Sequence, residues 1–135
     1  MEQGYLYIDQ KIYPTLLAIS EAEQEKGLMY QDWPPPIMSF IYSSPRISKF
    51  WMKNTPSPLD ILFCKDGQII EICKGEPHST KIIGGEYLTD LVVELPHGMA
   101  NQYDIIAGSR IGLAQPSAPD LKKICADKYG ILLKF

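Results

Sequence analysis

The sequence has few of the residues that mark redox and metal sites. It contains three cysteines, Cys64, Cys73 and Cys125, and two histidines, His78 and His97. The cysteines are odd in number and form no C-x-x-C pair, so we expect free thiols rather than a disulfide framework. The histidines stand far apart with no companion cysteine nearby, whereas metal ligands usually recur at short spacing. We therefore expect no metal site and no cofactor.

Motifs of nucleotide and serine-hydrolase chemistry are also missing. The chain has no G-x-S-x-G elbow, no P-loop and no G-x-G-x-x-G run, so an enzymatic role lacks its usual markers. No apolar run reaches the roughly 18 residues that a membrane span needs. The first residues, MEQGYLYIDQ, lack the basic and apolar regions of a secretion signal. We therefore expect a cytoplasmic protein with no membrane span.

Positive charge is not in excess. Lys and Arg total 13 against 16 Asp and Glu, which gives a net charge of −3 and a pI near 5.3. Lys122 and Lys123 are the only adjacent basic pair. Duplex-binding domains carry a clustered basic surface, so we expect no nucleic-acid partner.

The composition favours one compact β-rich domain over residues 1–135. Hydrophobic residues make up 45% and charged residues 21%, near the globular average. Eleven prolines and ten glycines indicate many turns, and eight tyrosines favour strands. We predict a mainly β, sandwich-like or barrel-like domain with two or three short helices.

Local signals predict several elements. Ser20-Glu21-Ala22-Glu23 is a capping box, which predicts a helix over 21–27 that stops at Gly27. Asp66-Gly67 between two apolar runs predicts a β-hairpin. We also expect a turn at 43–45 and a long loop over 74–89. Residues 114–135 are predicted to add a helix and a strand to a core over 12–113.

The segment Phe50–Phe63 (FWMKNTPSPLDILF) carries the strongest functional signal, because it places a polar island in an apolar run. A period of two puts Leu59, Ile61 and Phe63 on one face of a strand and Asp60 on the other. We expect the Asp60 carboxylate to accept hydrogen bonds from the backbone of residues 53–55, or to pair with Lys53.

These residues suggest a non-enzymatic module that binds a small polar ligand or a partner. The predicted site consists of Trp51, Lys53, Asn54 and Asp60, roofed by the loop over 74–89. Each residue also has a structural interpretation. Trp51 suits a core, Asn54 suits a left-handed turn, and Asp60 suits a tie for the bend before it.

Two alternatives remain open. Glu94 interrupts the apolar run Val92–Leu95, and a buried carboxylate there requires a partner, for which Lys53 and Arg110 are the candidates. Asp60 and Glu94 in one cleft would suit a hydrolase acting on a carbohydrate-like polar substrate. The other alternative is a purely structural accessory module.

Four segments together resemble a known family. They are SEAEQEKGLMY (20–30), FWMKNTPSPLDILF (50–63), Asp66-Gly67, and VVELPHG (92–98). In order and spacing they are similar to the family called domain of unknown function 192, from about Ile12 to Leu113. The resemblance implies a compact, mainly β domain and no established activity, and many relatives carry an export signal. We expect a monomer or a weak homodimer.

Overall fold

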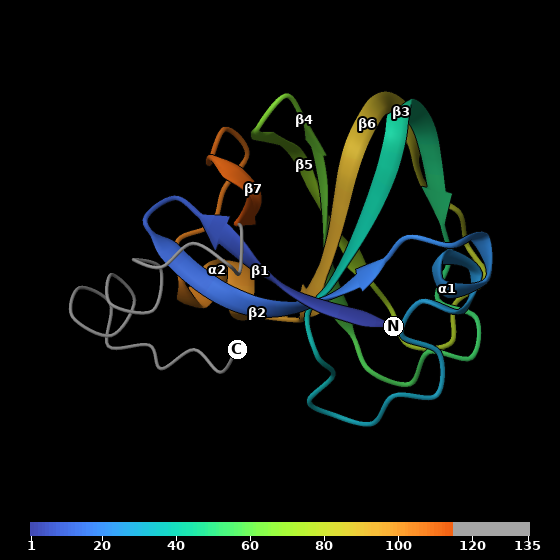
Figure 1. The fold of residues 1–135 in the computed structure, drawn as a ribbon. Helices are drawn as coiled ribbons and strands as arrows, with labels where there is room; N and C mark the ends of the chain where they lie inside the picture. Colours follow the sequence, from blue (N-terminus) through green and yellow to red (C-terminus); the bar gives the residue numbers. More distant parts are fainter. Residues whose placement is uncertain (115–135) are drawn as a thin grey trace.

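The computed structural model describes residues 1–114, which form one strongly curled sheet with two short helices on opposite sides of it (Figure 1). The strand order is β5-β4-β6-β3-β2-β1-β7. All neighbouring strands are antiparallel except β2 and β3. The elements are β1 (Glu2–Ile8), β2 (Lys11–Ala18), α1 (Glu21–Lys26), β3 (Met38–Phe50), β4 (Leu59–Lys65), β5 (Gln68–Gly75), β6 (Ile83–Pro96), α2 (Met99–Gln102) and β7 (Ile111–Ala114).

This architecture confirms the predicted mainly β, barrel-like single domain with short helices. The helix and strand expected in the extension over 114–135 lie, beyond Ala114, outside the described residues. Neither helix in the described part of the chain is long and apolar enough to cross a membrane.

Both short-range motifs form as predicted. The Ser20 hydroxyl accepts the Glu23 N–H at 3.1 Å, and the Glu23 carboxylate accepts the Ser20 N–H at 3.0 Å. Gly27 ends the helix with φ at 50°. In the hairpin, Asp66 and Gly67 both have positive φ, 52° and 79°. Two such residues make the turn whose twist matches the flanking strands.

The turn predicted at 43–45 is wrong, because β3 runs through it as one strand. Ile41 lies opposite Leu91 and Arg46 lies opposite Thr89, so the register against β6 shifts between these pairs. The extra residues of β3 form an irregular bulge. Pro45 suits this unpaired stretch, since it has no N–H to donate to a ladder.

The long loop predicted over 74–89 is also wrong. Strand β5 continues to Gly75 and β6 begins at Ile83, which leaves only residues 76–82 as a connection. Gly84 has φ at 86°, and a Cβ there would lie 2.6 Å from the Phe63 ring. The glycine therefore allows close packing within the sheet, and no roof of the predicted length exists.

The sheet buries both of its faces, and the side chains of β4 alternate between them as predicted. Leu59, Ile61 and Phe63 belong to one apolar cluster, while Leu62 and Cys64 belong to the other. The first cluster includes Phe40, Met52 and Val92, and the second includes Leu6, Val93 and Ile111. A carboxylate on β4 or β6 therefore meets a different environment on each face.

The two described cysteines are free, as expected. Cys64 packs in one cluster and Cys73 packs against the other, so the sheet separates them. Burial raises the pKa of the Cys64 thiol, and it raises the pKa of Cys73 to about 11. Both thiols are therefore protonated, and poor nucleophiles, at neutral pH. Cys125 lies outside the described residues.

Candidate functional site

Asp60 is buried and fully engaged by the connection between β6 and α2. One carboxylate oxygen lies 2.8 Å from His97 Nδ1, and the other accepts the N–H groups of Gly98 at 3.0 Å and Ala100 at 3.1 Å. The His97 N–H donates to the carbonyl of Pro58 at 3.0 Å, which ties the bend before β4 to the same place. The expected bonds from residues 53–55, or from Lys53, are therefore wrong. The physical reason is register, since Asp60 lies opposite Leu95, near the end of β6.

Glu94 lies on the other face of the same strand pair. It is opposite Ile61, whereas Asp60 is opposite Leu95. Directly opposed side chains in an antiparallel pair share a face. Glu94 therefore lies on the Ile61 face, and Asp60 points away from it. The two carboxylates do not face a common site, so the geometry does not assemble the acid/base pair considered for a hydrolase.

The Glu94 carboxyl is buried without a partner. Its residue is 4% exposed, and it makes no hydrogen bond or ion pair with any residue from 1 to 114. The expected pairing with Lys53 or Arg110 is wrong, because the Lys53 ammonium lies over the Trp51 ring at 5.2 Å and Arg110 lines a different hollow. Burial raises the pKa of Glu94 to about 8, so the carboxyl keeps its proton at neutral pH.

Glu94 lines a hollow of about 390 Å³ between α1 and β3, which we call the Glu94 hollow. Helix α1 is fixed there by Gln24, whose Nε2 donates to the carbonyls of Ala18 and Ile41, each at 3.0 Å. The turn that ends α1 lies close to the Glu94 carboxyl, since a Cβ on Gly27 would lie 3.7 Å from Glu94 Oε1. Buried Phe40 adjoins Glu94 in the lining, while Trp51 lines the hollow as an exposed side chain.

Tyr42 lines the hollow and interacts electrostatically with both Glu94 and Arg46. Burial raises the pKa of the Tyr42 phenol and the neighbouring Glu94 carboxyl also raises it, whereas Ser48 and Arg46 lower it. The Arg46 guanidinium lies 5.1 Å from the Tyr42 ring centroid. Lys49 follows on the same strand and also lines the hollow. An acidic group and a guanidinium thus act on one phenol, and a second basic group lines the same hollow.

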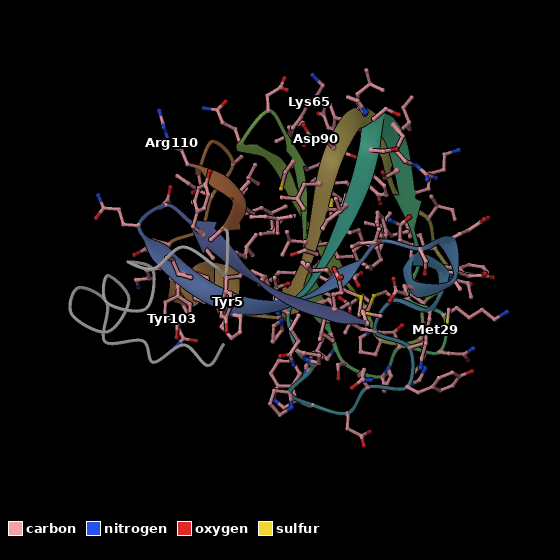
Figure 2. The ribbon with its side chains drawn as sticks, in the orientation of Figure 1. Tyr5, Met29, Lys65, Asp90, Tyr103 and Arg110 are labelled. Atoms are coloured by element: carbon pink, nitrogen blue, oxygen red, sulfur yellow. The ribbon has the colours of Figure 1, made fainter. Side chains whose placement is uncertain are left out.

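A second hollow of about 420 Å³ is lined by Tyr13, Tyr103 and Arg110, among others. Figure 2 shows Tyr103 and Arg110 on the opposite side of the molecule from Met29, which lines the Glu94 hollow. Lys11 lies over the Tyr103 ring at 4.5 Å, and burial is the main cause that raises the pKa of Tyr13 to about 12. No three metal-binding side chains come together anywhere in residues 1–114.

Of the four residues predicted to bind a ligand, the structure brings Trp51 and Lys53 together and directs Asp60 to the opposite face of the sheet from Glu94. Trp51 lines the Glu94 hollow, with Lys53 held over its ring. Asn54 has φ at 55°, and its carbonyl accepts the Tyr30 N–H at 2.8 Å, which matches the turn interpretation. Asp60 lies on the far face.

Tyr42 and Arg46 are not among the site residues predicted from the sequence, because the turn expected at 43–45 would separate them. The alternation of Met38, Phe40 and Tyr42 in the sequence is a signal that puts Tyr42 on the same strand face as Phe40. His97 was missed as the partner of Asp60, since nothing in the local sequence links the two.

The match to a family model covers residues 8–113 and decides the family. That model is domain of unknown function 192 (DUF192), described as an uncharacterized ACR. The chain belongs to this family. The resemblance stated from the sequence motifs is thereby confirmed.

Two solved structures resemble this DUF192 chain. A protein of unknown function from Novosphingobium aromaticivorans has a TM-score of 0.77 and 27% identity, over 82% of this chain and 84% of that one. A candidate transcription regulator from Sinorhizobium meliloti has a TM-score of 0.76 and 30% identity, over 83% and 94%. No curated protein matches the sequence.

Removal of the Asp60 carboxylate should destabilise the DUF192 domain strongly. Asp60→Ala leaves the N–H groups of Gly98 and Ala100 without their acceptor, and we expect a loss of about 3 kcal/mol in the free energy of unfolding. His97→Ala is the control, because water can replace its exposed side chain, and it should cost less than about 1 kcal/mol. Urea unfolding measures both. Equal losses would show that the histidine, rather than the backbone contacts, accounts for the stabilisation.

The free energy of unfolding of the domain should decrease as the pH rises, because of Glu94. Below about pH 4.5 the folded and unfolded chains both hold the Glu94 proton, and above about pH 8 neither does. Between these values only the folded chain holds it, so the free energy of unfolding decreases as pH rises. Glu94→Gln removes this decrease, and the variant should gain about 3 kcal/mol over the wild type between about pH 5 and pH 8. Urea unfolding at both pH values is the measurement, and a constant difference between the two proteins would contradict the burial argument.

Proposed function

We propose that this domain is a non-enzymatic module that binds a small polar ligand in the Glu94 hollow. The observation that carries the proposal is the Glu94 carboxyl, which lines the hollow, is 4% exposed and has no partner in residues 1–114. Nearly buried polar groups are usually hydrogen-bonded, and no fully buried side-chain oxygen of residues 1–114 lacks a hydrogen-bond partner, so the Glu94 oxygens, which form no hydrogen bond, are open to the hollow. A ligand in the hollow would supply the missing partner.

The shape and lining of the hollow support the same function. Its volume of about 390 Å³ falls within the range of small-molecule sites. Phe40 and Phe50 meet edge to face, with ring centroids 5.1 Å apart, and provide an apolar surface beside the carboxyl. Charged and polar side chains from α1 and β3 also line the hollow, and such groups are the ones that orient a polar ligand.

The four residues predicted from the sequence receive different roles in this proposal. Trp51 forms an aromatic edge of the site, and Lys53 holds its ring by a cation–π contact. We assign Asn54 to its left-handed turn and Asp60 to the junction between β6 and α2. Binding is favoured over hydrolysis because Asp60 and Glu94, the two weak catalytic candidates, face opposite sides of the sheet.

Trp51 fluorescence offers a direct test of the site. The chain has two tryptophans, so a Trp33→Phe background leaves Trp51 as the only reporter. A panel of sugars, amino acids, amines and organic acids is titrated at up to about 10 mM, a concentration that detects weak sites. At least one compound should change the emission saturably, and Glu94→Gln should weaken its binding by about tenfold or more.

Glu86→Gln is the matched control, because it makes the same chemical change at an exposed position of the same strand. It should leave the affinity unchanged. If no compound binds, or if Glu94→Gln and Glu86→Gln behave alike, the Glu94 hollow is not a ligand site.

A further inference from the structure

We propose that the ligand of the Glu94 hollow is a small organic amine, whose ammonium group binds Glu94 and whose hydrocarbon part packs on the aromatic side chains beside it. This inference rests on the proposed function and names the chemical class of its ligand. It is carried by an unpartnered carboxyl that opens into the hollow, and by the apolar surroundings that the strand register gives to that carboxyl.

The pairing of β6 with both of its neighbours surrounds Glu94 with apolar side chains. Met38 of β3 and Ile61 of β4 lie directly opposite Glu94. Phe40 lies opposite Val92, which is two residues from Glu94 and therefore on the same face of β6. None of these side chains carries an N–H or O–H donor. The sheet itself thus offers no group that could stabilise the charge of this carboxylate.

The basic side chains of β3 that line the hollow lie away from Glu94 along the sheet. Arg46 is opposite Thr89, five residues along β6 from Glu94. Lys49 is opposite Gly84, ten residues along the same strand. At about 3.3 Å per residue, these are separations of about 17 and 33 Å along β6. No cation of residues 1–114 forms an ion pair with Glu94, so its place is open to a ligand.

The Glu94 carboxyl opens into the hollow beside an aromatic ring. No fully buried side-chain oxygen in the described part of the chain lacks a partner, and the Glu94 oxygens form no hydrogen bond, so they are accessible from the hollow. A Cβ placed on Gly27 would lie 3.7 Å from Glu94 Oε1 and 3.4 Å from Phe40 Cζ. Both atoms are thus within 4 Å of one point, so the carboxyl and the Phe40 ring adjoin each other where α1 ends.

An ammonium group with a short hydrocarbon part matches both features. A hydrogen bond between a charged donor and a carboxylate is about twice as strong as one between neutral groups. Because Glu94 is 4% exposed, its ionised form needs a close cation to offset its desolvation. The Phe40 and Phe50 rings, with centroids 5.1 Å apart, provide apolar contact for the hydrocarbon part. A sugar would bring several hydroxyl groups to this apolar wall, and an organic acid would bring a second acidic group beside Glu94.

Binding of an amine should release a proton from the protein. Glu94 holds its proton in the free domain near neutral pH and must lose it to pair with an ammonium group, so amine affinity should rise about tenfold from pH 6 to pH 7. On β4 the opposite residue, Ile61, has no titratable group. The other charged and titratable groups that line the hollow come from α1 and β3. They are Glu21, Glu25 and Lys26 on α1, and Tyr42, Arg46 and Lys49 on β3. All of them except Tyr42 are exposed, and burial raises the pKa of the Tyr42 phenol, so the phenol stays neutral in this range.

The test uses isothermal titration calorimetry of the whole chain at about pH 7 with isobutylamine, cyclohexylamine and benzylamine. Each amine is compared with the alcohol of the same carbon skeleton, which keeps the hydrocarbon part and removes the charge. At least one amine should bind about tenfold or more tightly than its alcohol. Titrations in buffers of different ionisation enthalpy should show release of about one proton per bound amine.

Two matched variants assign the ammonium group to Glu94. Glu94→Gln keeps the shape of the side chain and removes its charge, so it should abolish the preference for the amine over its alcohol. Glu86→Gln makes the same change at an exposed position of β6 and should leave the preference unchanged. Amine binding that survives Glu94→Gln, or that releases no proton, would contradict the assignment. If an uncharged compound or an acid binds in a Glu94-dependent way while no amine does, the amine is wrong and the proposed function stands. If no compound of any class binds, both fail.

Discussion

Strands β4 and β6 pair from Leu59 opposite Pro96 to Cys64 opposite Leu91, and both polar sites of this domain depend on that register. The pairing sets which side chains meet across the ladder and which face each of them occupies. It directs Asp60 to the face where β6 runs into α2, and Glu94 to the face covered by α1. A slip of one residue in either strand would turn its side chains to the other face and bring Asp60 and Glu94 onto the same one.

The two carboxylates show how environment decides the state of one chemical group. Asp60 meets three donors at hydrogen-bonding distance, two of them backbone N–H groups, so its burial is compensated by the chain itself. Glu94 lines a hollow together with aromatic side chains and receives no donor from residues 1–114, and burial raises its pKa to about 8. The chain thus completes one site internally and leaves the other without a partner in residues 1–114. This contrast, rather than any motif, is the basis of the functional proposal.

Short-range features were predictable from the sequence because their physics is local. The Ser20–Glu23 capping box, the Asp66-Gly67 turn and the alternation along β4 each depend on residues within a few positions of one another. The family resemblance was also accessible from motifs. The apolar neighbours of Glu94 indicated that, if buried, this carboxylate would require a partner, but the pairing expected with Lys53 or Arg110 was wrong.

Long-range register was not predictable in the same way. The bulge in β3 arises where Ile41 and Arg46 meet Leu91 and Thr89 of a strand far along the chain. The Asp60 carboxylate finds His97, 37 positions away, because two strands end together and not because of any spacing in the sequence. Gly84 resembled a loop glycine, but its role is to admit the Phe63 ring. In each case the deciding contact belongs to tertiary structure, which overrides a local signal.

The central claim is that the β4–β6 register keeps the two carboxylates on separate faces without shared partners. A double-mutant cycle with Asp60→Asn and Glu94→Gln, measured by urea unfolding at about pH 6, tests this most directly. At that pH Glu94 holds its proton, so no direct charge repulsion links the two positions. The changes in unfolding free energy should add to within about 0.5 kcal/mol. A coupling energy above about 1 kcal/mol would place both groups in one network and contradict the account.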